Sequence, residues 1–215
     1  MRIIKILSLT VLSISFILSF SGCHNSNALV QFSADNPALT PAKKVMLWNG
    51  HDFTGWSFVL KDTDYDANKV WSVNDGAILC QGKPAGYMRT DKTFINYKLH
   101  VEWRWPEKAG NSGIYFHLQE PDKVWPTTFE CQLRSGKAGE VLRRPTFHES
   151  NEKPIGQWNS ADIHCRNNTV IIYINGLLQS KADDLNFSSG KIALQSEGTP
   201  IEFRNVYIEP LDKKG

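Results

Sequence analysis

The residues with the greatest chemical potential lie in three segments, 99–105, 114–119 and 129–134. Each segment alternates apolar and polar residues, and in a β-strand alternate side chains point to opposite faces. The polar sides are formed by His100, Glu102 and Arg104, by Tyr115, His117 and Gln119, and by Glu130, Gln132 and Arg134. These types suit ligand binding and proton transfer. If the three strands are neighbours, their polar sides form the floor of one groove, which is the candidate site.

A divalent metal is one possible occupant of this groove. Glu102, His117 and Glu130 could converge on a single ion if the strands are neighbours. The sequence holds no short ligand motif such as His-Glu-x-x-His. The metal therefore depends entirely on how the strands are placed.

Composition limits the classes of function. A chain of 215 residues with 41% hydrophobic residues can form one sizeable core. Its formal net charge is only +2, and it has no basic run, which argues against a nucleic-acid partner. Seven Trp and six Tyr suit sugar binding, because aromatic rings stack on the apolar faces of pyranoses, although most such rings would also fill a core.

The N-terminus has the pattern of an export signal. Arg2 and Lys5 precede an apolar run at residues 6–20, which is too short and wrongly flanked for a stable membrane span. Ser21-Gly22-Cys23 resembles a bacterial lipobox, so residues 1–22 are expected to be a signal peptide and Cys23 to carry lipid. A plain secretion signal cut nearby is the alternative.

Residues 23–44 are then expected to be the lipidated Cys and a flexible tether, since they are polar and without periodicity. The expected location is the cell envelope, with the protein anchored in the outer membrane. No acidic residue directly follows Cys23, which favours the periplasmic side over the surface.

Three further cysteines, Cys80, Cys131 and Cys165, allow at most one disulfide. Their spacing matches no zinc pattern. Cys131 and Cys165 occupy alternating apolar positions, which favours packing in the core.

Residues 45–212 read as one all-β domain. Short alternating segments are separated by strong turn signals such as Asn74-Asp75-Gly76 and Asn175-Gly176, and no helical period of ten residues appears. This pattern predicts a β-sandwich or barrel. The long segment 135–156, which contains His148, is expected to be a functional loop, and Trp125 is expected to be exposed in the loop 120–126.

The order of these segments resembles the 3-keto-disaccharide hydrolase family, formerly a domain of unknown function found in many Bacteroidetes lipoproteins. The matching segments are LWNGHDFTGW (47–56), VWSVNDGAILC (70–80), YKLHVEWRW (97–105), NSGIYFH (111–117), FECQ (129–132), GQWN (156–159), INGL (174–177), GKIALQSEG (190–198) and IEFRNVYIEPL (201–211). The resemblance implies a concanavalin A-like jelly roll of two antiparallel sheets with a polar concave groove. In many relatives an Asp follows the Glu-x-Gln strand. In this sequence Leu133-Arg134-Ser135 follows Gln132 instead, and Glu140 is the nearby carboxylate.

The resemblance also implies cleavage of glycosides that carry a ketone at C3. Such a ketone acidifies the C2 proton, so that a base can remove it and the enolate can expel the aglycone from C1. Water then adds to the enone, and the net reaction is hydrolysis. The site needs a base, a stabiliser for the enolate oxygen and an acid for the leaving group.

On this basis His117 or Glu130 is the expected base, and the other is an acid or metal ligand. Arg104 is expected to stabilise the enolate or to hold Glu102, with which it could instead form a structural ion pair. The expected substrate-binding residues are Asn111, Tyr115, Trp125, Gln132 and His148.

Two other functions stay open from the sequence. One is a conventional glycanase in which Glu102 and Glu130 act as a carboxyl pair on an unoxidised glycan. The other is a lectin-like module that binds glycans without turnover. Many functions share this fold, so the fold alone does not choose among them.

Overall fold

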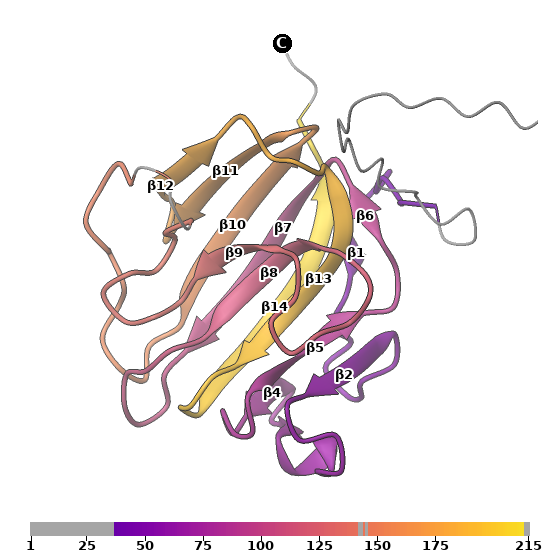
Figure 1. The fold of residues 1–215 in the computed structure, drawn as a ribbon. Coiled ribbons are helices and arrows are strands. Elements are labelled where there is room, and N and C mark those ends of the chain that lie inside the picture. The colour runs from indigo at the N-terminus through magenta and orange to yellow at the C-terminus, as the bar shows by residue number, and fades with distance from the viewer. Residues whose placement is uncertain (1–36, 142–143, 145, 213–215) are drawn as a thin grey trace, which may run out of the picture. The chain divides into compact units, whose positions relative to one another are not determined.

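The computed structural model describes residues 37–212 except 142, 143 and 145. Two antiparallel sheets form a sandwich (Figure 1). The first sheet has the order β12 (Leu177–Ala182), β11 (Thr169–Ile174), β10 (Asn159–Arg166), β7 (Tyr97–Arg104), β14 (Ile201–Pro210), β4 (Ala77–Cys80) and β3 (Trp71–Asn74), with β1 (Val45–Met46) paired to β14. The second has the order β2 (Trp56–Leu60), β5 (Gly86–Thr90), β13 (Ser189–Ser196), β8 (Gly113–Leu118) and β9 (Phe129–Gln132), with β6 (Phe94–Ile95) paired to β13.

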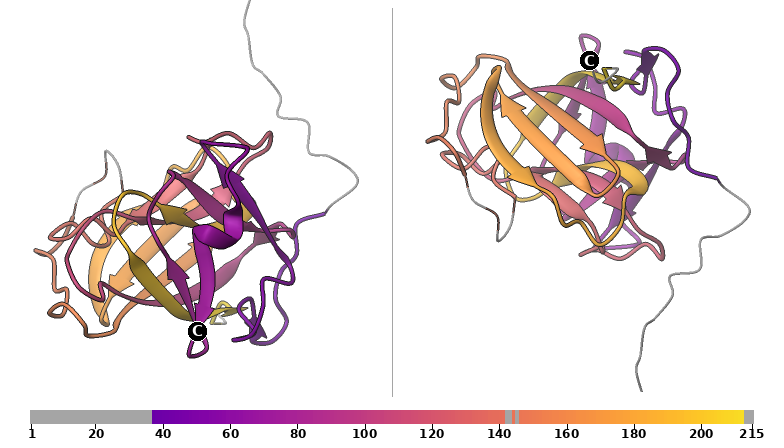
Figure 2. Two further views of the ribbon diagram at one scale, coloured as in Figure 1. Left: turned by 90° about the horizontal axis from the view of Figure 1, so that it is seen from below. Right: turned by 90° about the horizontal axis from the view of Figure 1, so that it is seen from above.

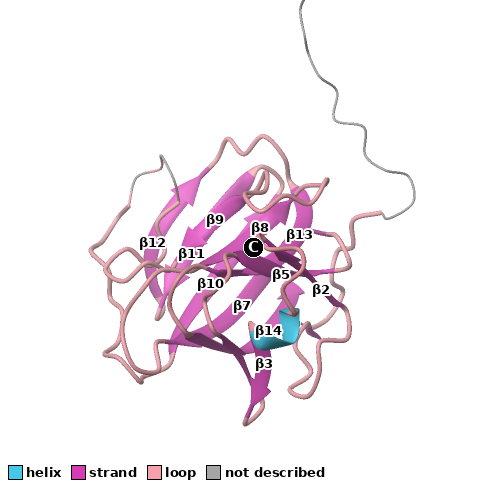
Figure 3. Ribbon diagram, turned by 60° about the horizontal axis from the view of Figure 1, so that its bottom comes forward, coloured by secondary structure: helices cyan, strands magenta, loops and turns pink. Residues whose placement is uncertain are grey.

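The all-β prediction is confirmed, and the arrangement is that of a jelly roll. The views from below and above in Figure 2 show how the two sheets cover each other. The described residues contain a single helical turn, the 3₁₀ helix η1 (Ala67–Lys69), which stands out in Figure 3. No helix in the described part of the chain is long and apolar enough to cross a membrane.

Local sequence explains the hairpins. Asp75 and Gly76 join β3 to β4 with φ of +48° and +74°, and Asn175 and Gly176 join β11 to β12 with φ of +48° and +79°. A two-residue turn with both φ values positive matches the twist of the flanking strands, and Asn, Asp and Gly adopt it most readily. Both predicted hairpins are therefore present.

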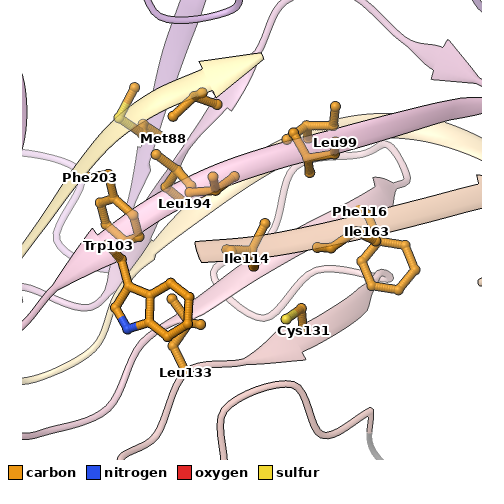
Figure 4. Packing of buried hydrophobic residues seen from close by; sticks show 14 of the residues in the cluster. Met88, Leu99, Trp103, Ile114, Phe116, Cys131, Leu133, Ile163, Leu194 and Phe203 are labelled. Atoms are coloured by element: carbon orange, nitrogen blue, oxygen red, sulfur yellow. The ribbon is translucent and has the colours of Figure 1, made fainter. Parts of the chain in front are cut away.

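The core lies between the two sheets and is built from the apolar sides of their strands. Strand β7 contributes Leu99, Val101 and Trp103, all fully buried. Facing residues come from the second sheet, and Figure 4 shows part of this packing. Cys80, Cys131 and Cys165 are all buried and free of disulfides, which confirms the burial predicted for Cys131 and Cys165.

The condition for one shared groove, that the three polar strands are neighbours, is met only for two of them. Strands β8 and β9 pair in the second sheet, whereas β7 lies in the first, between β10 and β14. Each strand turns its apolar side toward the shared core. The polar side of β7 therefore faces outward on one side of the sandwich, and that of β9 faces outward on the other.

Strand β8 carries a β-bulge that changes which side chains face outward. Tyr115 lies opposite Ala193 and Leu118 lies opposite Lys191, so two residues of β8, Phe116 and His117, face one residue of β13. His117 has a φ of +54°. An extra residue in one strand reverses the alternation beyond it. The imidazole of His117 therefore points into the core although its parity in the sequence matches Tyr115.

The predicted signal peptide (1–22), the predicted lipidated Cys23 and the first part of the tether lie outside the described residues. The last part of the tether, from residue 37, is described, and Leu39 forms an isolated bridge with Phe94.

Candidate functional site

The outer face of the second sheet carries a cluster of polar side chains that includes Glu130. Glu130 and Gln132 come from β9, Tyr115 comes from β8, and Gln195 comes from β13. Glu197 directly follows β13 and forms a bridge with Asn111, which precedes β8. Three neighbouring strands thus bring together residues that are up to 86 positions apart in the sequence, from 111 to 197.

Gly113 makes room for the carboxyl group of Glu130. An ideal Cβ on Gly113 would lie 2.1 Å from Glu130 Oε1 and 3.0 Å from Gln195 Oε1. The first distance is shorter than real Cβ atoms show and the second is tight, so any side chain at position 113 would displace the Glu130 carboxyl from this place. Both oxygen atoms therefore lie beside the backbone of Gly113.

No positively charged side chain among residues 37–212, apart from the undescribed 142, 143 and 145, pairs with the carboxyl of Glu130. Burial raises its pKa, and the nearby negative charge of Glu197 raises it further, to about 7. Burial disfavours a charged carboxylate and a like charge does the same. Glu130 is therefore suited to gain or lose a proton near neutral pH.

Three oxygen atoms of the cluster residues are buried and have no hydrogen-bond partner among the described residues: Asn111 Oδ1, Glu130 Oε1 and Gln195 Oε1. Buried polar atoms are usually paired, so an unpaired group of them indicates a place where a ligand or a proton supplies the missing donor. Sugar hydroxyls are donors of this kind.

Two donors complement these acceptors. The Oε1 of Gln132 accepts hydrogen bonds from the backbone N–H groups of Leu133 and Arg134, at 3.0 and 2.8 Å. This fixes the amide and leaves Nε2 with no partner in the described chain. The hydroxyl of Tyr115 likewise has none, and burial together with the nearby Glu130 raises its pKa, so it stays protonated. The face therefore offers acceptors around Gly113 and donors beside them.

The loop between β8 and β9 crosses one end of this face. Asp122 accepts hydrogen bonds from the Nε and Nη2 of Arg89 on β5, at 2.8 and 2.6 Å, and Glu120 pairs with Lys191 on β13 at 2.5 Å. These ion pairs fasten the loop to the sheet. Trp125, on the same loop, is 60% exposed, which confirms its predicted exposure.

His148 lies in the long loop that follows β9. It lines a cavity of about 510 Å³ together with Glu140, Glu149 and Gln179. The backbone N–H of Gln132 donates to the carbonyl of Glu140 at 3.0 Å, so this loop continues the edge of the sheet beside Gln132. The structure thus places His148 in a neighbouring cavity, and its contact with substrate stays a prediction.

Glu102 and Arg104 lie on the opposite outer face of the sandwich, which is a correction to their predicted place beside Glu130. Arg104 pairs with Glu202, and Glu102 accepts hydrogen bonds from Arg204 Nε at 2.6 Å and from Asn205 Nδ2 at 2.9 Å. Arg104 therefore neither holds Glu102 nor reaches the Glu130 face.

Trp158 completes this second network. The guanidinium carbons of Arg104 and Arg204 lie 4.7 and 4.0 Å from the centroid of its ring. Cation–π contacts and ion pairs together satisfy these charges, which is typical of a structural network that joins β7 to β14.

His117 is fully buried in the core, and its predicted role as a base in an open groove does not fit this position. Its ring lies 5.8 Å from that of Tyr97 and 5.6 Å from that of Phe116. Burial lowers its pKa to about 4. Glu102 thus lies on one outer face of the sandwich, Glu130 lies on the other, and His117 lies in the core between them. These three residues cannot share one metal ion.

Sequence reasoning missed Gly113, Gln195 and Glu197 as parts of the site. The alternation Lys191, Ala193, Gln195 and Glu197 along β13 was a usable signal, because it places the two polar residues on one face. The pattern within this segment does not show which sheet the strand joins.

Comparison with known proteins agrees with this architecture. A family model described as the 3-keto-alpha-glucoside-1,2-lyase-like domain matches residues 43–209, and the chain belongs to this family. A 3-keto-disaccharide hydrolase of Bacteroides thetaiotaomicron is 24% identical over 231 aligned positions, which cover 78% of each chain.

Solved structures show the same fold. A Parabacteroides distasonis protein named as a candidate glycosyl hydrolase is 25% identical, with a TM-score of 0.63 over 79% of this chain and 94% of that one. The β-glucanase of Bacillus licheniformis is 15% identical, with a TM-score of 0.52 over 78% and 97%. The second likeness concerns the fold alone.

The raised pKa of Glu130 predicts a pH-dependent cost of folding. Between its ordinary pKa of 4.5 and about 7 the folded state binds more protons than the unfolded chain, so stability falls as pH rises through this window. Glu130→Gln removes this pH-dependent loss of stability. Its free energy of unfolding, relative to that of wild type, should increase by up to about 3 kcal/mol between pH 4.5 and 8. Urea unfolding across this range measures it. If the difference in unfolding free energy between the two proteins does not change with pH, the raised pKa of Glu130 is contradicted.

His117 should have the opposite effect on the pH dependence of stability. Its folded pKa of about 4 lies below the ordinary 6.5, so the folded protein binds fewer protons and loses stability as pH falls from 6.5 to 4. His117→Leu should abolish this loss, of about 3 kcal/mol, and should retain activity. Chemical denaturation at pH 7 and pH 4.5 tests the first point. Loss of turnover in a folded His117→Leu protein would contradict this prediction and would indicate that His117 takes part in the reaction.

Proposed function

We propose that this protein cleaves 3-keto-glycosides on the outer face of the second sheet, with Glu130 as the base that removes the C2 proton. The membership of the 3-keto-alpha-glucoside-1,2-lyase-like family supports a glycan substrate. The observation that carries the proposal is the Glu130 carboxyl, with a pKa of about 7 and a buried Oε1 that has no partner among the described residues, on the same face as the donors of Tyr115 and Gln132.

Glu130 is well matched to the first step. A C2–H bond next to a ketone is a weak acid, and a carboxylate with a pKa near 7 is a stronger base than an ordinary one while still ionised at neutral pH. The C2–H bond breaks, the proton passes to Glu130, and the electron pair forms the enolate.

The enolate then needs hydrogen-bond donors at its oxygen. Tyr115 Oη and Gln132 Nε2 are donors on the Glu130 face that have no partner among the described residues, and two backbone N–H groups hold the amide of Gln132 in place. Donors fixed in advance stabilise developing negative charge without reorganisation. These two groups take the role that the sequence assigned to Arg104.

Collapse of the enolate expels the aglycone from C1 as an alkoxide, which takes up a proton to leave as an alcohol. Addition of water to the enone places a hydroxyl on C1 and a proton on C2. The sum of these steps is hydrolysis of the glycosidic bond. Asn111 Oδ1 and Gln195 Oε1 are acceptors that suit the remaining sugar hydroxyls.

A glycanase that uses Glu102 with Glu130 does not fit the structure. The two carboxyls of such a pair stand roughly 5 to 10 Å apart across one glycosidic bond. Here they lie on the two outer faces, with the core between them. One sugar cannot contact both.

A time course of aglycone release tests the proposal. Purified protein is given a 3-keto-glucoside or its unoxidised parent. Release only from the keto compound is expected, with a loss of about 100-fold or more in Glu130→Gln and a smaller loss in Tyr115→Phe.

Glu102→Gln is the matched control, because it removes the same charge from the opposite face and should keep turnover once folding has been verified by thermal unfolding. Release from the unoxidised glycoside would instead indicate a conventional hydrolase. Binding of either sugar without release would indicate a lectin-like module.

A further inference from the structure

We propose that Gln195 and Glu197 are positioning residues that hold a proton on Glu130. Glu197 orients the amide of Gln195, and Gln195 Oε1 then accepts a hydrogen bond from the protonated carboxyl of Glu130. This inference rests on the proposed role of Glu130 and adds two residues to the site.

The first argument is that two acceptors lie beside the same glycine. An ideal Cβ on Gly113 would lie 2.1 Å from Glu130 Oε1 and 3.0 Å from Gln195 Oε1. Both oxygens are buried without a hydrogen-bond partner among the described residues, and Gln195 is only 3% exposed. Neighbouring acceptors that are shielded from water repel each other, and a proton on one of them allows a hydrogen bond between them.

The second argument is the orientation of the Gln195 amide. Burial raises the pKa of Glu197, and a side-chain hydrogen bond from Gln195 opposes part of that rise. Only the N–H₂ end of an amide can donate to a carboxylate. With that end turned to Glu197, the oxygen end is left for Glu130.

The charges around Glu130 favour the same protonated form. On β8 it faces the hydroxyl of Tyr115, beyond which lies Tyr87 of β5, and after β13 it faces Glu197. On its own strand the neighbouring thiol of Cys131 points into the core, and burial raises its pKa, so it stays neutral. No cation among the described residues pairs with the Glu130 carboxyl. Glu197 is thus the charged group that acts on it.

This arrangement stabilises the product of the proton transfer. When the C2–H bond breaks and an O–H bond forms on Glu130, Gln195 Oε1 receives the new hydrogen bond. The same contact orients the carboxyl for a later return of the proton to C2 during hydration. Loss of either residue should therefore lower the pKa of Glu130 and weaken it as a base.

Carbon-13 NMR of the glutamate carboxyls tests the inference directly. Purified protein labelled at Glu Cδ is titrated from pH 4 to 9, with Glu130→Gln to assign the Glu130 signal. Wild-type Glu130 should titrate near 7. Glu197→Gln and Gln195→Asn should each lower this value by about one unit. Glu102→Gln is the matched control, because Glu102 lies on the opposite outer face and pairs with Arg204.

Turnover of a 3-keto-glucoside supplies a second readout. The acidic limb of the pH–rate profile should move by the same amount in Glu197→Gln and Gln195→Asn, which a purely structural role would not cause. The NMR result stands without turnover, so failure of the proposed activity is distinguishable from failure of this inference.

Two results would overturn it. One is a Glu130 signal that titrates near 4.5 in wild type or does not move in Glu197→Gln. The other is binding of Ca²⁺ or Mn²⁺ by the wild-type protein that suppresses the Glu130 titration, because a cation would then occupy the place assigned to the proton.

Discussion

The burial of one apolar side of every strand between two sheets is the constraint on which this molecule depends. Leu99, Val101 and Trp103 of β7 pack toward the second sheet, so the polar side of β7 must face outward. The same requirement turns Glu130 outward from the other sheet. Packing thus creates two polar faces with the core between them, and any reaction has to occur on one of them.

The two faces differ in how their charges are satisfied. Around Trp158, every charged group of the network has a partner, since Arg104 meets Glu202 and Arg204 meets Glu102. On the Glu130 face, Glu130 Oε1, Gln195 Oε1 and Asn111 Oδ1 are buried and have no hydrogen-bond partner in the part of the chain that the structure describes. A satisfied network stabilises a fold, whereas unpaired buried groups cost stability and are retained where they serve a ligand. This difference supports the proposal that the site lies on the Glu130 face.

The sequence predicted the local features, namely the hairpins and the two sides of β7 and β9. It did not predict features that depend on pairing between distant strands. Asp75-Gly76 and Asn175-Gly176 specify their hairpins through positive φ, and the alternation in β7 and β9 correctly divides their inner and outer sides. Alternation does not state which sheet a strand joins, so Glu102 was placed beside Glu130. The bulge at His117 arises from pairing with β13, and it moved that side chain from the predicted groove into the core.

A crystal structure of the Glu130→Gln protein with a bound 3-keto-glucoside would test the central claim most directly. The account predicts that the sugar lies on the outer face of β8, β9 and β13, with C2 next to the residue 130 side chain and the C3 oxygen near Tyr115 and Gln132. A sugar bound beside Trp158 on the opposite face, or in the cavity lined by His148 with C2 far from residue 130, would contradict it.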